Sequence, residues 1–184
     1  MITPQAFSCT KSVTASILGP SITVSNTSTP KTEVYLISTA DEPAHIIINA
    51  SFLPKYTLTR DRRVSMRLTV EKINPYPHDL YLQSFQMLLV GYTDIRAGSA
   101  TSTQRSCHTI QSLSNINMQL FSAFDDAKTQ RSINPALWDE KMLPDFVIPS
   151  FDACGLSMRY ELEILMGFQC RGVTVCYFSG LVQS

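Results

Sequence analysis

The segment Val64-Ser-Met-Arg-Leu-Thr-Val70 alternates strictly between apolar and polar residues. Side chains on a β-strand point to opposite faces in turn, so this period of two places Val64, Met66, Leu68 and Val70 on one face. The intervening Ser, Arg and Thr residues fall on the other face. The segment therefore predicts a β-strand with one apolar face and one polar face.

A second segment, near the C-terminal end, shows the same period. Every second residue from Tyr160 to Phe168 is apolar or aromatic, while Glu161 and Glu163 fall on the opposite face. We expect these two glutamates to lie on an exposed strand face. Gly172 indicates a turn, and residues 173–178 are predicted to pair back in the antiparallel direction.

Further strands are predicted where β-branched and aromatic residues are dense. These strands span residues 32–38, 45–52, 80–93 and 116–120. The segment 80–93 suits a strand that is bulged or buried on both faces. Asn74 to Asp79 contains two prolines and predicts a turn, whereas Ala97 to Ser106 is small and polar and predicts a mobile loop.

The composition is that of a folded domain. The chain has 184 residues, of which 44% are hydrophobic, which is sufficient for a core. Short strands, regular turn signals and the lack of a long amphipathic helix pattern predict an all-β sandwich. Residues 1–31 are rich in Ser and Thr and are predicted to form a flexible tail with one short strand at 21–24. Residues 32–184 are predicted to form the sandwich.

Charge and cysteine content exclude several classes of protein. The 15 basic and 15 acidic residues balance, which argues against a nucleic-acid-binding protein because phosphates require a basic excess. Five scattered cysteines without a Cys-x-x-Cys pair fit reduced thiols. The chain shows no secretory signal and no apolar run of about 18 residues. We therefore expect a soluble cytoplasmic protein.

No pattern in the chain predicts catalysis, a metal site or a cofactor. The three histidines lack the spacing of zinc ligands. Cys107 and His108 are adjacent, but neighbours on a strand point to opposite faces. Asp125 and Asp126 lack the alternating ligands of a calcium loop, so we expect them on a solvated connection. Trp138 is predicted to anchor the core.

The densest basic cluster consists of Arg60, Arg62 and Arg63 around Asp61. Arginine pairs well with phosphate, so these three residues are candidates for contact with an anionic lipid or a phosphorylated cargo tail. The alternative interpretation is a charged hairpin tip without a ligand.

Three segments together resemble the C-terminal half of fungal arrestin-like proteins, the α-arrestin or arrestin-related trafficking adaptor group. They are residues 51–60 with the Val64 strand, residues 80–97, and residues 137–164. In the third segment, Pro149-Ser-Phe leads through Arg159-Tyr160 into the strand with alternating glutamates. The resemblance spans residues 45–172.

This resemblance implies an immunoglobulin-like arrestin β-sandwich that corresponds to one C-terminal arrestin domain. It implies a non-enzymatic adaptor that links membrane cargo tails to ubiquitin-dependent endocytosis or sorting. Such an adaptor is recruited to the plasma membrane or endosomes. Family members recruit ubiquitin ligases through a Pro-Pro-x-Tyr motif, whereas this chain contains no Pro-Pro pair.

The expected binding mode is contact with a concave face or the addition of an extended peptide to an open sheet edge. Two other interpretations stay open at the level of sequence. One is a half-size homologue that forms a homodimer through an exposed apolar face. The other is an enzyme on a β scaffold, which would bring His108 close to carboxylates.

Overall fold

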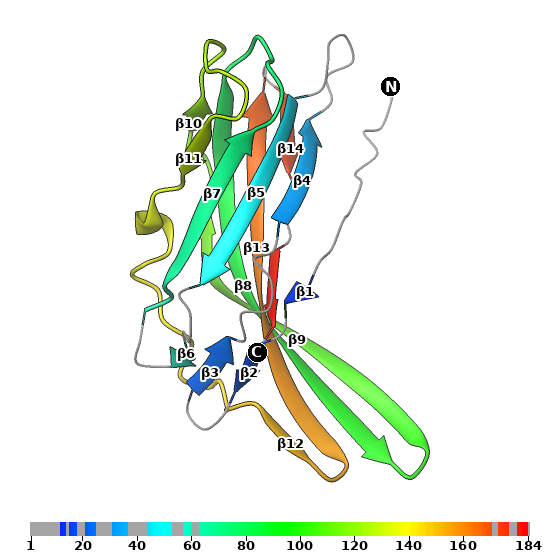
Figure 1. The fold of residues 1–184 in the computed structure, drawn as a ribbon. Helices are drawn as coiled ribbons and strands as arrows, with labels where there is room; N and C mark the ends of the chain where they lie inside the picture. The colour runs from blue at the N-terminus through cyan, green and yellow to red at the C-terminus, as the bar shows by residue number, and fades with distance from the viewer. Residues whose placement is uncertain are drawn as a thin grey trace.

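The computed structural model in Figure 1 describes most of the chain from residue 44 onward and several shorter segments before it. The described ranges are 12–13, 15–17, 21–24, 31–36, 44–52, 57–59, 63–170, 173–176 and 180–183. Side chains are described for residues 44–51 and 63–170.

Two β-sheets of the described residues stack into a sandwich, with a third small sheet beside them (Figure 1). The largest sheet is built around β8 (Leu80–Ala97) and β13 (Leu156–Cys170), which pair antiparallel along almost their full length. Its other strands are β1 (Ser12–Val13), β9 (Ala100–Leu113), β10 (Met118–Phe121), β12 (Phe151–Ala153), β14 (Val173–Cys176) and β15 (Gly180–Gln183).

The opposing sheet has four strands in the order β11, β7, β5, β4. They are β11 (Gln130–Ser132), β7 (Met66–Lys72), β5 (Ala44–Phe52) and β4 (Lys31–Leu36). The third sheet consists of β2 (Ala15–Ile17), β3 (Ser21–Val24) and β6 (Thr57–Thr59). The predicted all-β sandwich is thus confirmed, and among the described residues only a single 3-10 turn, η1 (Pro135–Leu137), is helical.

The alternating segments supply the core, as their period predicts. Val64 and the apolar positions of β7 are buried, and so is every second residue of β13 from Tyr160 to Phe168. Trp138 is also buried, with its ring tilted against Phe85 at a centroid distance of 5.6 Å. Its predicted role as a core anchor is confirmed.

The strand β8 is bulged, as expected from its composition. Against β13 the extra residue is Gln83 of β8, whereas in the pairing with β9 the extra residue is Ile110 of β9. A bulge increases the local twist of a strand. Beyond the sandwich, β8 continues into a hairpin with β9, and we call residues 93–104 of this hairpin the arm (Figure 1).

The prediction of a loop at Ala97 to Ser106 is wrong, because β9 begins at Ala100. The turn is limited to the residues around Gly98, whose φ of 62° is the left-handed conformation that glycine adopts without strain. Small polar residues on both faces of β9 conceal the period of two, so pairing with β8 rather than local sequence makes this segment a strand.

The short strand predicted at residues 21–24 is β3, and the antiparallel strand predicted after Gly172 is β14. The division between a tail at 1–31 and the sandwich stays a prediction. The described part of the chain contains no helix that is long and apolar enough to cross a membrane.

Candidate functional site

The predicted basic cluster is only partly described. Arg63 is exposed and forms an isolated antiparallel bridge with Met142, next to the hydrogen bond that Val64 N–H donates to the Lys141 carbonyl at 2.9 Å. Arg60 and Arg62 lie outside the described residues. Contact of these arginines with an anionic lipid or a phosphorylated tail stays a prediction.

The pair Cys107 and His108 lies on β9 with its side chains on opposite faces of the sheet. Cys107 stands opposite Val90 and is exposed, whereas His108 stands opposite Leu89, whose side chain is in the core. We call the face of Cys107 the outer face and the face of His108 the inner face. Glu161 pairs with Val90 and therefore belongs to the outer face, so His108 does not converge with it.

A row of polar side chains crosses three strands on the outer face. Tyr92 of β8 stands between Arg105 of β9 and Arg159 of β13. The Arg159 guanidinium lies 4.6 Å from the centroid of the Tyr92 ring, and an Arg105 nitrogen lies 3.4 Å from a carboxylate oxygen of Glu163. Cross-strand pairs of this kind stabilise the register of a sheet.

The expectation of two exposed glutamates is wrong for Glu161, which is only 5% exposed. Burial and the hydrogen bond with Glu161 raise the pKa of the Tyr92 phenol. A buried carboxylate requires such partners, because the loss of hydration is otherwise uncompensated. Glu163 retains more exposure and pairs with Arg105.

The edge of β9 is open along the part of the chain that the structure describes. Thirteen of its 14 residues pair with β8 on one side, and no described strand pairs with the other side. None of the described backbone hydrogen bonds outside the strands involves it. In an antiparallel strand every second residue directs its N–H and C=O groups away from its partner, so β9 presents a row of available donors and acceptors.

Proteins usually protect such edges with proline, several charges or a covering segment. The β9 sequence contains no proline, and Arg105 is its sole charged residue. The edge is therefore long and lacks proline and multiple charges, while Leu137 and Phe146 contact the side chains of Gln111 and His108 near its C-terminal end.

The inner face of β9 carries the polar residues Ser102, Gln104 and Ser106 and, among the described residues, meets an exposed aromatic ring only near His108. The rings of His108 and Phe146 contact each other edge to face at a centroid distance of 4.7 Å. Phe146 is nevertheless 62% exposed, and Ile110 of β9 packs partly against the core. Both sides of β9 are thus mainly polar, with Arg105 on the outer side and the Phe146 ring against His108 on the inner side.

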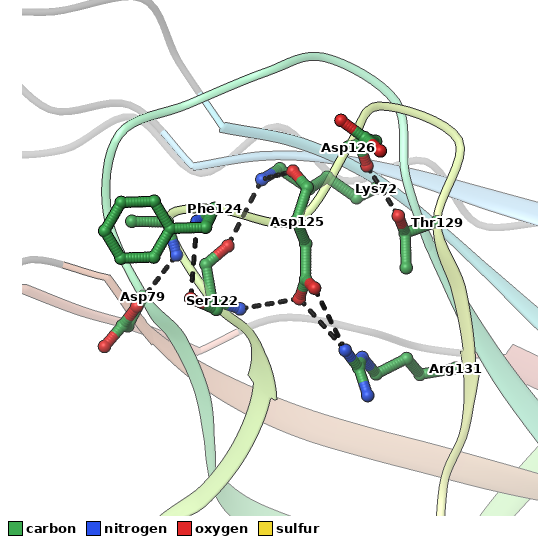
Figure 2. A network of polar contacts seen from close by, with 9 residues as sticks. Lys72, Asp79, Ser122, Phe124, Asp125, Asp126, Thr129 and Arg131 are labelled. Carbon is green, nitrogen blue, oxygen red and sulfur yellow. Dashed lines mark hydrogen bonds and ion pairs between the residues drawn. The ribbon is translucent and has the colours of Figure 1, made fainter.

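A second feature lies at the opposite end of the sandwich, where residues 122–129 connect β10 to β11 (Figure 1). Lys72 at the end of β7 is fully buried, and its Nζ donates to the carbonyls of Ser122 at 3.3 Å and Asp125 at 2.6 Å (Figure 2). The ammonium also lies 4.5 Å from the centroid of the Tyr76 ring. Burial raises the pKa of the Tyr76 phenol well above its usual range.

The carboxylate of Asp125 completes this network. It accepts from the Ser122 backbone N–H at 2.7 Å and pairs with the Arg131 guanidinium at 3.1 Å (Figure 2). The hydrogen bond from Ser122 N–H is the larger cause that holds the pKa of Asp125 below its usual value, and the Arg131 guanidinium lowers this pKa further. The connection is largely exposed at Asp126 to Lys128, as expected, whereas Asp125 is engaged within the protein.

Phe124 occupies the same loop and is 96% exposed. Its backbone N–H donates to the Ser122 hydroxyl at 3.3 Å, and the neighbouring Ala123 N–H donates to the Asp79 carboxylate at 2.8 Å. The loop conformation is therefore set by hydrogen bonds rather than by burial of the Phe124 ring.

Within the described residues, no group of three or more His, Cys, Asp or Glu side chains is arranged to hold a metal ion. Comparison of the chain with protein-family models found no matching family, and comparison with curated proteins found no matching protein. Membership of the arrestin-like group stays a prediction from residues 45–172.

Proposed function

We propose that this protein is a protein-binding module that receives an extended peptide along the edge of β9. The observation that carries the proposal is the 14-residue strand with one unpaired edge among the described strands. Addition of a strand to such an edge supplies main-chain hydrogen bonds without any catalytic group. The arm extends this edge beyond the two stacked sheets (Figure 1).

The cytoplasmic tails of membrane proteins are the ligands that the arrestin-like resemblance suggests. In this proposal the protein acts in the cytoplasm as a non-enzymatic adaptor and links such cargo to ubiquitin-dependent endocytosis or sorting. An unstructured tail adopts the extended conformation needed for strand addition without having to unfold first.

A proline substitution on β9 tests this proposal. Thr103 and Gln104 are neighbours on the strand, so one directs its N–H toward β8 and the other toward the open edge. Proline at the outward position removes a donor to the ligand and leaves the pairing with β8 intact. Thr103→Pro and Gln104→Pro are compared. We expect the variant whose lost N–H pointed to the open edge to keep the wild-type unfolding curve and to lose peptide binding.

The measurement is binding to an array of peptides that cover cytoplasmic segments of membrane proteins. The wild type should bind a subset of the array, and the well-folded proline variant should bind much more weakly. Unchanged binding by that variant contradicts strand addition at β9.

A homodimer is the second candidate, and the exposed apolar residues of the arm and of the adjoining β12–β13 hairpin favour it. Ile95 and Leu156 are cross-strand partners and are 45% and 40% exposed, while Phe151 of β12 is 38% exposed. Exposed apolar residues that adjoin one another are typical of an association surface. Light scattering at two protein concentrations distinguishes the two candidate functions. A wild-type dimer that Ile95→Lys converts to a monomer supports the homodimer.

A further inference from the structure

We infer that the edge of β9 at residues 100–107 recognises the main chain of its ligand. It accepts proline-free extended peptides largely irrespective of their charge and of the order of their side chains. The inference rests on the proposed function, because it defines the class of ligand that the same edge takes. Strand addition itself requires only available N–H and C=O groups on both strands.

Polar side chains along this part of β9 are engaged with their own sheet. The Thr103 hydroxyl donates to the Asp94 carboxylate at 2.5 Å, and the Ser106 hydroxyl donates to the Gly91 carbonyl at 3.4 Å. Both acceptors belong to β8, which lies on the side of β9 away from the open edge. A ligand at the edge therefore meets main-chain donors and acceptors, whereas these two hydroxyl protons are already committed.

The single charge on β9 is also directed across its own sheet. An Arg105 nitrogen lies 3.4 Å from a Glu163 carboxylate oxygen, and Glu163 belongs to β13 on the far side of β8. Asp94 of β8 lies 3.8 Å from the Arg159 guanidinium in the same way. Opposite charges that lie this close together largely cancel each other's field, so the edge has little means to select a ligand by charge.

The segment from Leu137 to Phe146 limits the length of the site. Gln111 Nε2 donates to the Leu137 carbonyl at 3.2 Å, and the rings of His108 and Phe146 contact each other at a centroid distance of 4.7 Å. This segment therefore borders the C-terminal part of β9, whereas residues 100–105 are exposed. The edge from 100 to 107 pairs with about eight residues of an added strand.

A peptide fits this edge better than a second copy of the chain does. The outer face of β9 carries Thr101 and Thr103 here, and the inner face carries Ser102 and Gln104. Pairing of two β9 edges would bury little apolar surface, whereas stable homodimers bury large apolar interfaces. An unstructured peptide can form the main-chain hydrogen bonds of strand addition without such an interface.

The probe is a fluorescein-labelled ten-residue peptide composed of Thr, Ser and Val with one central Gln. Two comparison peptides carry Glu or Lys in place of Gln, and a third contains the same residues in scrambled order. A fourth is N-methylated at its six central residues, which removes its main-chain donors. Fluorescence anisotropy with the full chain measures the dissociation constant of each peptide.

We expect the Gln, Glu, Lys and scrambled peptides to bind within about 3-fold of one another, because they present the same main chain. The N-methylated peptide should bind at least about 10-fold more weakly, since several hydrogen bonds are lost together. Arg105→Gln should change each dissociation constant by less than about 2-fold. Its matched control is Arg67→Gln, which alters an exposed arginine on β7 of the opposing sheet.

Amide hydrogen exchange of the full chain locates the bound peptide. Binding should slow exchange within residues 100–107 and leave residues 108–113 unchanged. Protection that is confined to residues 108–113 overturns the inferred location.

The outcomes separate this inference from the proposed function. Dissociation constants of the Glu, Lys and scrambled peptides that differ beyond the expected range overturn main-chain recognition and leave strand addition standing. Undiminished binding of the N-methylated peptide overturns strand addition itself, and a wild type that binds none of the peptides overturns both. A wild-type dimer that the well-folded proline variant of β9 dissociates would show that a second copy occupies the edge, which also overturns the inference.

Discussion

At the scale of single residues, Lys72 shows how a buried charge organises a loop. Its side chain is fully buried, and its ammonium is bound by the Ser122 and Asp125 carbonyls and by the face of the Tyr76 ring. A buried ammonium is costly unless it is fully hydrogen-bonded. Lys72 therefore specifies one conformation of residues 122–129.

Lys72→Met is expected to lower the free energy of unfolding by about 1–3 kcal/mol, because two carbonyls lose their donor while the apolar stem is retained. Urea unfolding measures the change. Lys128→Met alters an exposed lysine of the same loop and should stay within about 0.5 kcal/mol of the wild type. A Lys72→Met protein as stable as this control would show that the network does not order the loop.

Asp125 makes part of the stability dependent on pH. Its pKa in the folded state lies below the ordinary value of 3.8, first because Ser122 N–H donates to it and then because Arg131 pairs with it. The stabilising contribution is therefore present above the ordinary pKa and is lost as the pH falls through the folded-state pKa. Asp125→Asn should be less stable than the wild type at pH 7.

The difference between wild type and Asp125→Asn should shrink as the pH falls below about 4, where the wild-type carboxylate takes up a proton. Thermal unfolding followed at a series of pH values tests this expectation. A stability difference that is constant from pH 7 to pH 3 would show that the charge on Asp125 is irrelevant to folding.

At the scale of elements, the packing of β8 between β9 and β13 requires a glycine at position 91. A Cβ atom at Gly91 would lie 2.7 Å from the Ser106 hydroxyl oxygen and 3.1 Å from the Tyr160 ring. The close approach of these side chains explains why the middle of a long strand tolerates a residue with poor strand propensity.

Gly91→Ala is expected to destabilise the protein by about 1–3 kcal/mol through overpacking. Adding Ser106→Ala should restore part of the loss, because the nearest atom is removed while the Tyr160 ring remains. Chemical denaturation of the two single variants and the double variant gives the coupling. Strict additivity of the two changes would contradict the proposed clash.

At the scale of the whole molecule, the core and the candidate binding edge are partly separate. The buried residues are concentrated in the sandwich, whereas none of the residues 93–104 in the arm is buried. Stability therefore resides mainly in the stacked sheets, and the arm is available for contact with a partner.

Replacing residues 94–103 by Asn-Gly should leave a folded protein, because this dipeptide favours the tight turn that would connect Thr93 to Gln104. We expect the free energy of unfolding to change by about 1 kcal/mol or less, since the removed side chains are mostly exposed. Peptide binding should weaken because the open edge is shorter. Loss of cooperative unfolding would show that the arm belongs to the folding core.

The sequence by itself determined the all-β class, because apolar alternation is a local property that survives in any β context. It identified the buried positions of β7 and β13, the bulged β8 and the anchoring Trp138. The features of the candidate site were decided by tertiary structure. Small polar residues make β9 a strand only through its pairing with β8, and Glu161 and Lys72 are buried only because distant segments supply their partners. Local patterns carry no information about such partners, so the open edge of β9 emerges only from the assembled sheets.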